Sequence, residues 1–161
     1  MSSPKDDVEK ALRYGYFFLK FRPRSKKEMV IYLNKKSIRY RWGTSIVEAV
    51  VKRLEEEGFV DDDVFVRWFV EQRSSRKLKG EYALRQELRR FGIEDERVDR
   101  YFLEHPLKEK EHAHTVLMRR WPRLGSLPRE KRIQKAYSFL LRRGFDFGVV
   151  KKTIADVEKK E

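Results

Sequence analysis

Apolar residues recur every three or four positions along most of this chain, which is the pattern of amphipathic helices. Between residues 45 and 57, for example, Val47, Val50 and Leu54 fall on one helix face. The apolar run from residue 14 to residue 21 alone resembles a strand, but its setting in a longer helical pattern favours helix. No alternating stretch is followed by a hairpin turn, so the pattern predicts an all-α protein.

The same pattern places helix boundaries. Ser45 and Glu48 form an S-x-x-E capping box that predicts a helix start, and Gly58 predicts the end of that helix. The run Asp61 to Asp63 predicts the start of the next helix, where carboxylates complement the dipole.

Nine helices are predicted in three groups, which we interpret as three tandem three-helix repeats occupying residues 1–59, 60–104 and 105–161. The predicted helices span residues 5–22, 25–36, 45–57, 62–77, 80–91, 95–104, 108–121, 128–143 and 146–158.

The groups share a weak internal repeat. The segment 88–93 ends the second helix of the second group, and the segment 140–145 ends the equivalent helix 52 residues later. Each carries a glycine, Gly92 or Gly144, and an acidic residue follows in each, Asp95 or Asp146. In the first group Leu33 and Ile38 match, with Ser37 in place of the glycine and residues 39–44 as a small insertion. Stacked repeats predict an elongated, curved helical array of right-handed type.

Composition narrows the class of protein. The 161 residues include no cysteine, which excludes disulfides, Cys-ligated zinc, iron–sulfur clusters and thiol nucleophiles. No apolar run approaches the roughly 18 residues that a membrane span needs, and the first residues lack the apolar stretch of a signal peptide. We therefore expect a cytoplasmic protein that does not bind a membrane, and a monomer.

The net charge of +13 indicates an anionic partner, and its distribution is uneven. Residues 1–59 carry 14 Lys and Arg against 8 Asp and Glu, and residues 105–161 carry 15 against 7. Residues 60–104 are near neutral, with 10 against 11. The basic excess therefore lies in the first and third groups.

No catalytic, cofactor or metal motif is present. The glycines form neither a dinucleotide fingerprint nor a P-loop. His112 and His114 are two positions apart, so on a helix they point about 200° apart and cannot share a metal ion. We expect no enzyme activity, no cofactor and no metal.

Basic residues gather instead at helix ends and joints. As candidates for contact with DNA or an acidic protein we select Arg22, Arg24, Lys26, Lys27, Lys35, Lys36, Arg39, Arg41, Arg73, Arg76, Lys77, Lys79, Arg85, Arg89, Arg119, Arg120, Arg123, Arg142 and Arg143. About half are expected to pair with nearby carboxylates instead, for instance Arg85 with Glu81 four residues earlier.

Aromatic residues lie beside several of these cations. Tyr40, Trp42, Trp68 and Trp121 could stack on bases, or they could belong to the core, and the core is the more frequent arrangement. Trp121 precedes a proline and is expected to close the end of its helix.

Three passages resemble the RecX family, the small regulators of the RecA recombinase. They are R-P-R-S-K-K-E-M at 22–29, L-E-E-E-G-F-V-D-D-D-V-F at 54–65, and Arg73 with Lys79-Gly80 followed by 88–93. Val66 departs from the alanine usual in the family, and residues 39–44 and 121–128 are individual to this chain. The third group fits the family's more variable last repeat.

The resemblance implies three three-helix repeats, no enzymatic activity, and binding to the RecA–DNA filament along its groove. It also implies modulation of RecA, usually inhibition of strand exchange, ATP hydrolysis and coprotease function. Single- or double-stranded DNA would then be a weak partner of the chain alone. Two alternatives stay open: a RecA-independent helical DNA-binding protein, and a hydrolase or nuclease, for which no metal cluster is apparent.

Overall fold

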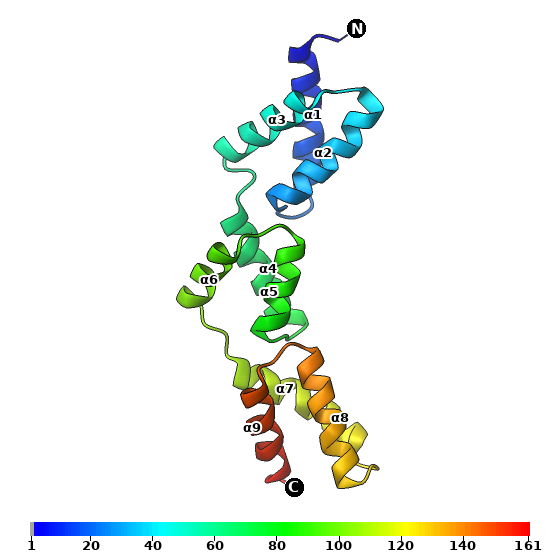
Figure 1. The fold of residues 1–161 in the computed structure, drawn as a ribbon, viewed down its shortest axis with the longest axis vertical. Coiled ribbons are helices and arrows are strands. Elements are labelled where there is room, and N and C mark those ends of the chain that lie inside the picture. The colour runs from blue at the N-terminus through cyan, green and yellow to red at the C-terminus, as the bar shows by residue number, and fades with distance from the viewer. Residues whose placement is uncertain (1) are drawn as a thin grey trace. The chain divides into compact units, whose positions relative to one another are not determined.

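A computed structural model describes residues 2–161, and these residues form helices and turns without any strand (Figure 1). The all-helical prediction is therefore confirmed. The helices are α1 (Pro4–Leu19), α2 (Lys26–Tyr40), α3 (Thr44–Glu56), α4 (Asp62–Arg76), α5 (Glu81–Arg90), α6 (Asp95–Glu104), α7 (Glu109–Arg120), the short 3₁₀ helix η1 (Trp121–Leu124), α8 (Arg129–Arg142) and α9 (Phe147–Glu158).

The chain divides into two compact units, which we call unit 1 and unit 2. Unit 1 comprises the described residues through Trp68 together with Arg89–Arg97, and unit 2 comprises Phe69–Leu88 and Val98–Glu161. Helices α4, α5 and α6 each contribute residues to both units.

Unit 1 is built around the three-helix group α1–α2–α3. Each of these helices turns an apolar face to a shared core, in which Leu12, Met29, Leu33, Val50 and Leu54 are almost completely buried. Burial of such side chains stabilises the fold by about 1.5–3 kcal/mol each. The helical spacing seen in the sequence therefore marks the core faces of this unit.

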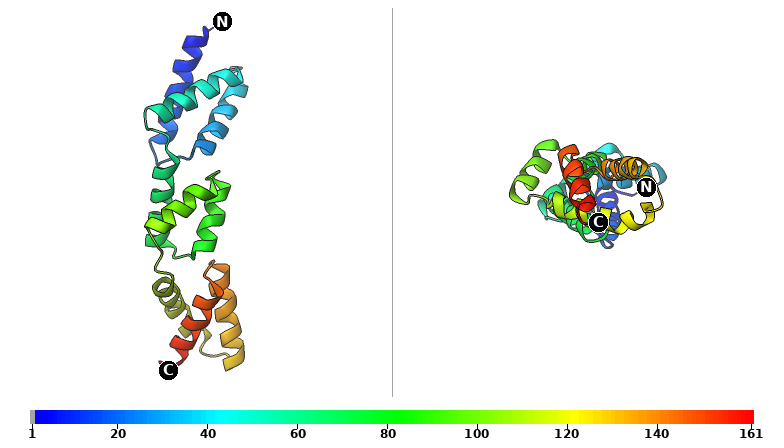
Figure 2. Two further views of the ribbon diagram at one scale, coloured as in Figure 1. Left: turned by 60° about the vertical axis from the view of Figure 1, so that its left-hand side comes forward. Right: turned by 90° about the horizontal axis from the view of Figure 1, so that it is seen from below.

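Unit 2 has its own core around α7, η1, α8 and α9, and the three α-helices lie together in the left view of Figure 2. Leu117, Leu140 and Val150 are completely buried at its centre. Trp121 closes the end of α7 as expected, with its ring buried and its indole Nε1 donating a hydrogen bond to Glu161 Oε1 at 2.7 Å.

The start of α3 differs from the prediction. The expected capping box of Ser45 and Glu48 is wrong, because α3 begins at Thr44 and its N-cap residue is Gly43, which has no side chain to accept a hydrogen bond. Ser45 lies one residue inside the helix. Threonine and serine in succession make the boundary ambiguous in sequence, and the extended backbone of Gly43 decides it.

The aspartates that were expected to start helices do so. The side chain of Asp61 accepts a hydrogen bond from the backbone N–H of Asp63 at 2.9 Å, at the start of α4. Asp146 is the N-cap of α9 and accepts from the N–H of Gly148 at 3.0 Å. These carboxylates serve helix starts, as expected for residues beside exposed backbone N–H groups.

The repeat is visible where α2, α5 and α8 end. Gly92 follows α5 with φ 77° and Gly144 follows α8 with φ 82°, which confirms the equivalence of the two glycines. The assignment of Ser37 to this position is wrong, because α2 continues through Ser37 to Tyr40. The left-handed residue is Arg41, with φ 56°. Helix α2 is thus one turn longer than the predicted segment.

The residue after the left-handed position is apolar and buried at the ends of α2, α5 and α8. These residues are Trp42, Ile93 and Phe145. The expected match at Ile38 is wrong, since Ile38 lies within α2 with 82% of its surface exposed. The backbone N–H of Trp42 instead donates to the carbonyl of Ser37 at 3.1 Å, which is the closing bond of a Schellman-type turn.

Candidate anion-binding site

The basic residues selected from sequence fall into two sets in the structure, those held by carboxylates and those without one. The first set forms ion pairs and consists of Arg22, Arg24, Lys26, Arg73, Lys79, Arg85 and Arg89. A cation already neutralised by a neighbour has less electrostatic free energy to offer a partner. The second set is therefore the better source of an anion-binding site.

The motif at residues 22–28 is a structural joint within unit 1. Glu28 binds both guanidinium groups of the motif, at 2.5 Å from Arg22 and 3.9 Å from Arg24. Arg24 also donates from Nε to the carbonyl of Phe18 at 3.0 Å and lies over its ring. Burial lowers the pKa of Arg24, which is consistent with an enclosed position. Arg22 and Arg24, which belong to the motif that resembles the RecX family, thus stabilise the fold.

Two further clusters in unit 2 are also neutralised. Glu87 binds Lys79 and, at 3.0 Å, Arg73. Arg85 binds Asp99 and Glu81, the latter as expected from the four-residue spacing. Burial opposes the charge of Arg85, but the hydrogen bonds to these carboxylates outweigh it and raise its pKa.

Six of the selected cations line one pocket of unit 2, with a volume of about 240 Å³. The basic lining residues are Arg76, Lys77, Arg119, Arg120, Arg123 and Arg143. Leu78, Val116 and Phe139 complete the lining, and no carboxylate is part of it. Among the described residues, none of the six cations forms an ion pair. We call this feature the basic pocket.

Helix ends bring these residues together. Arg76 ends α4, Arg120 ends α7, Arg123 lies in η1, and Arg143 follows the last residue of α8. Basic residues are favoured at helix C-termini because they complement the negative end of the dipole. Local sequence therefore explains why basic residues stand at these helix ends, and the packing of unit 2 brings the helix ends together around one pocket.

Backbone contacts fix the loop before α5 against the end of α8. The N–H of Gly80 donates to the carbonyl of Arg143 at 2.8 Å. In return, the Arg143 guanidinium donates to the carbonyl of Leu78 at 3.3 Å. These two bonds hold one wall of the basic pocket to the other.

Phe139 supports two of the guanidinium groups. Arg120 lies 5.5 Å and Arg143 lies 5.0 Å from its ring centroid, both within the range of a cation–π contact. The sequence analysis missed this role, although the four-residue spacing from Phe139 to Arg143 at the end of α8 was a usable signal.

The remaining selected cations lie elsewhere. Lys36 and Arg39 lie over the rings of Tyr14 and Tyr40, and Lys27 donates to the carbonyl of Arg90 at 3.2 Å. The structure records no ion pair for the three exposed residues Lys35, Arg41 and Arg142. The structure therefore brings six of the selected residues into one site in unit 2.

The aromatic residues considered for base stacking belong mainly to the cores. Trp42 and Trp121 are each 6% exposed, and Tyr40 stacks on Trp42. Phe17 and Phe21 in unit 1 are among the exposed rings; they contact each other edge to face and were not singled out from sequence.

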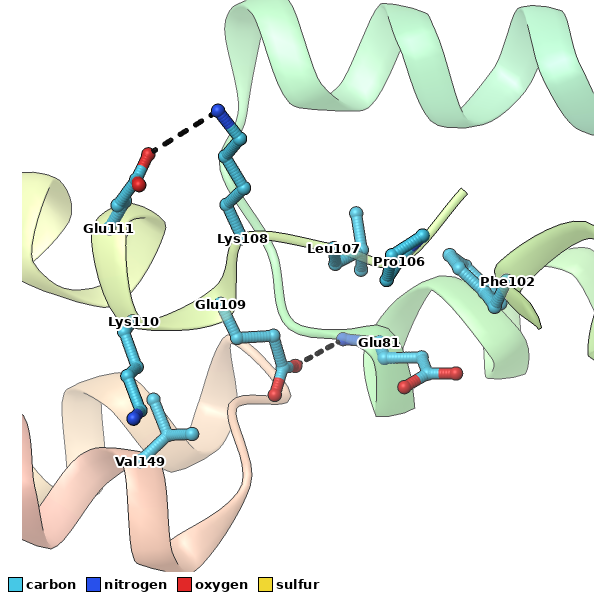
Figure 3. Close-up of a pocket in the computed structure, with 9 residues that line it drawn as sticks. All are labelled: Glu81, Phe102, Pro106, Leu107, Lys108, Glu109, Lys110, Glu111 and Val149. Carbon is cyan, nitrogen blue, oxygen red and sulfur yellow. Dashed lines mark hydrogen bonds and ion pairs between the residues drawn. The ribbon is translucent and has the colours of Figure 1, made fainter. Parts of the chain in front are cut away.

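A second pocket in unit 2, about 460 Å³ in volume, has mixed charge and a structural role (Figure 3). Glu109 reaches across it and accepts a hydrogen bond from the backbone N–H of Glu81 at 2.7 Å. Burial raises the pKa of Glu109. This carboxylate caps the first turn of α5, so we assign it to the fold.

Within residues 2–161 no group of three or more His, Asp or Glu side chains is arranged to hold a metal ion. His112 is half-buried, and burial lowers its pKa. No helix among these residues is long and apolar enough to cross a membrane.

Comparison with known proteins gives a consistent result. The family model described as RecX, second three-helix domain, matches residues 61–100, and RecX, third three-helix domain, matches residues 108–154. A regulatory protein RecX of Prosthecochloris aestuarii is 30% identical over 154 residues, which cover 94% of this chain and 95% of that protein.

Relatives differ in length. A regulatory protein RecX of Oceanobacillus iheyensis is 29% identical over 158 residues, which cover 98% of this chain and 57% of that protein. The chain thus spans little more than half of some curated relatives.

The fold also matches solved structures. The crystal structure of RecX from Lactobacillus salivarius aligns with a TM-score of 0.82 over 96% of this chain and 98% of that one, at 17% identity. That identity supports the fold alone. Together with the two domain models and the 30% identical relative, it confirms the resemblance seen in the sequence, and the chain belongs to the RecX family.

Proposed function

We propose that this chain binds the RecA–DNA nucleoprotein filament and modulates RecA, mostly by inhibiting recombinase, ATPase and coprotease activities. It would act in the cytoplasm in DNA repair, recombination and the SOS response. In this role it is a monomeric binding protein organised as three repeats, at residues 1–59, 60–104 and 105–161, with no catalytic activity and no cofactor.

The basic pocket is the observation that carries this proposal. A filament of protein on DNA presents closely spaced negative charge, and association with such a surface gains from unneutralised cations. The six cations of the pocket meet that requirement, whereas Arg22 and Arg24 are already paired with Glu28. The family membership supplies RecA as the partner to test first.

The test is the DNA-dependent ATPase activity of RecA. The chain is expected to slow ATP hydrolysis at less than one molecule per RecA protomer. Charge reversal in the pocket, R119E with R123E, is expected to weaken this inhibition at least tenfold, because two attractive contacts become repulsive.

The matched control is K151E with K152E, which makes the same charge change on exposed residues of α9 outside the pocket. This control is expected to keep most of the inhibition. Unchanged ATP hydrolysis at saturating wild-type protein would contradict the proposal.

The alternative is a RecA-independent DNA-binding protein, and the same pocket favours it chemically. Binding to bare DNA, measured with and without RecA, separates the two. Equal affinity in both conditions, with no effect on RecA, supports the alternative.

A further inference from the structure

We infer that the basic pocket is a phosphate-binding site that takes two neighbouring phosphate groups, and that Phe139 positions two of its guanidinium groups. This inference deepens the proposed function, because it names the ligand chemistry of the same pocket. The phosphates could come from a nucleic-acid backbone or from a free pyrophosphate group.

The first argument is the lack of neutralisation. Elsewhere in unit 2, basic clusters recruit carboxylates of the chain itself, as Glu87 does for Arg73 and Lys79. The basic pocket gathers six cations without one carboxylate in its lining. Mutual repulsion of these cations disfavours the compact fold unless an anion enters.

Helix dipoles do not explain why these cations gather in one pocket. The preference of cations for helix C-termini explains why Arg76, Arg120 and Arg143 each lie at a helix end. It gives no reason for three such ends to face one pocket. Their convergence is better explained by a shared ligand.

The second argument concerns the size and density of the ligand charge. The volume of about 240 Å³ is smaller than the roughly 300–1,000 Å³ of pockets that enclose whole drug-sized molecules. It therefore fits phosphate groups better than a complete nucleotide. Five of the six cations are arginines, whose planar groups bind phosphate oxygens in pairs.

The third argument is pre-organisation. Arg143 is fixed by the carbonyl of Leu78 and the ring of Phe139, and Arg120 is held by that same ring. Guanidinium groups that are already oriented lose less conformational entropy when a ligand binds. Phe139 is a positioning residue that acts through these two arginines.

The experiment is titration calorimetry of the full chain with pyrophosphate at low salt, without RecA. The wild-type protein is expected to bind one pyrophosphate per chain. R119Q with R123Q is expected to weaken binding at least tenfold, and K151Q with K152Q to change it less than twofold. Absence of pyrophosphate binding, or equal binding by the pocket variant, would overturn the inference.

Phe139 is tested by variants that keep the net charge. F139L is expected to weaken pyrophosphate binding about threefold or more, and F139Y to retain it, because the aromatic face is kept. Thermal unfolding by circular dichroism checks that each variant is folded. Equal affinities of folded F139L and F139Y would reject the positioning role.

Two further ligands identify the source and chemistry of the anion. A single-stranded oligothymidylate that competes with pyrophosphate supports a backbone ligand, and failure to compete supports a free one. Tricarballylate, a compact tricarboxylate, is expected to bind more weakly, and equal binding would reject phosphate selectivity.

The calorimetry contains no RecA, so it tests this inference separately from the proposed function. A failed ATPase test with intact pyrophosphate binding rejects only the proposed function. Inhibition of the ATPase without pyrophosphate binding rejects only this inference.

Discussion

Ser25 connects two parts of unit 1 through three hydrogen-bonding roles. Its hydroxyl accepts from the N–H of Glu28 at 3.2 Å and donates to the carbonyl of Phe91 at 2.7 Å, and its own N–H donates to Glu28 at 2.9 Å. The side chain is completely buried. One residue therefore caps α2 and satisfies a carbonyl 66 positions away.

S25A is expected to lower the free energy of unfolding by about 2 kcal/mol. The change removes an N-cap, worth about 0.5–2 kcal/mol, and leaves the Phe91 carbonyl without its partner. Urea unfolding measures the loss. The matched control is S3A, since Ser3 forms the same kind of capping box with Asp6 on α1 but is exposed. An equal loss in both variants would show that the link to Phe91 adds nothing.

At the scale of residues, sequence could identify the cations but not their partners. Arg22 and Arg76 are equally basic in the sequence, yet Glu28 neutralises the first and the second lines the basic pocket. Pairing across four residues, as between Arg85 and Glu81, was predictable because the helix sets it. Contacts made by packing of distant segments, such as that of Arg120 with the ring of Phe139, were not predictable.

At the scale of elements, the turn between α8 and α9 lies very close to the backbone at the start of α5. Gly144 has φ 82°, and a Cβ added there would lie 2.4 Å from the Cβ of Ala83. Gly80 makes the reciprocal approach, since its added Cβ would lie 2.1 Å from the carbonyl oxygen of Gly144. The glycines permit α5 and the end of α8 to approach at backbone distance.

G144A is expected to destabilise unit 2 by about 3 kcal/mol or more, because left-handed strain adds to a steric overlap. G58A is the control, since Gly58 has a similar φ of 77° and open space around it. It is expected to cost about 1–2 kcal/mol in unit 1. Native-state hydrogen exchange reads the opening of each unit separately. Equal costs would mean that the approach to Ala83 is easily relaxed.

Helix positions were largely predictable, because the apolar faces that mark them also form the cores. The end of α2 was not, since the position filled by glycine after α5 and α8 is filled by Arg41. Arginine carries no signal for a left-handed backbone, so the extra turn through Ile38 was invisible in the sequence. The predicted start of α3 was also wrong, because the N-cap residue is Gly43 and has no side chain to cap the helix.

At the scale of the whole molecule, the net charge of +13 says less about binding than the number of cations that are not paired with a carboxylate of the chain. Many cations form ion pairs within the chain, and each such pair at the surface contributes about 0–1 kcal/mol to the stability of the fold. The six of the basic pocket remain available. Affinity for a polyanion should therefore depend on a few residues and not on the total charge.

This dependence predicts the salt sensitivity of binding to single-stranded DNA. Each neutralised phosphate contributes about 0.7 to the slope of log affinity against log salt concentration. R119Q with R123Q should therefore reduce the slope by about 1.4, whereas K151Q with K152Q should leave it unchanged. Fluorescence anisotropy over a range of salt concentrations measures both. Equal slopes for wild type and the pocket variant would show that these arginines do not contact phosphates.

The buried indole of Trp121 has a practical consequence for such measurements. It lies in the sequence between Arg120 and Arg123 of the basic pocket, and its N–H is bonded to Glu161. The other two tryptophans, Trp42 and Trp68, belong to unit 1. Replacing those two by phenylalanine leaves Trp121, next to Arg120 in the sequence, as the single tryptophan, so that ligand entry can be followed by tryptophan emission without an attached dye.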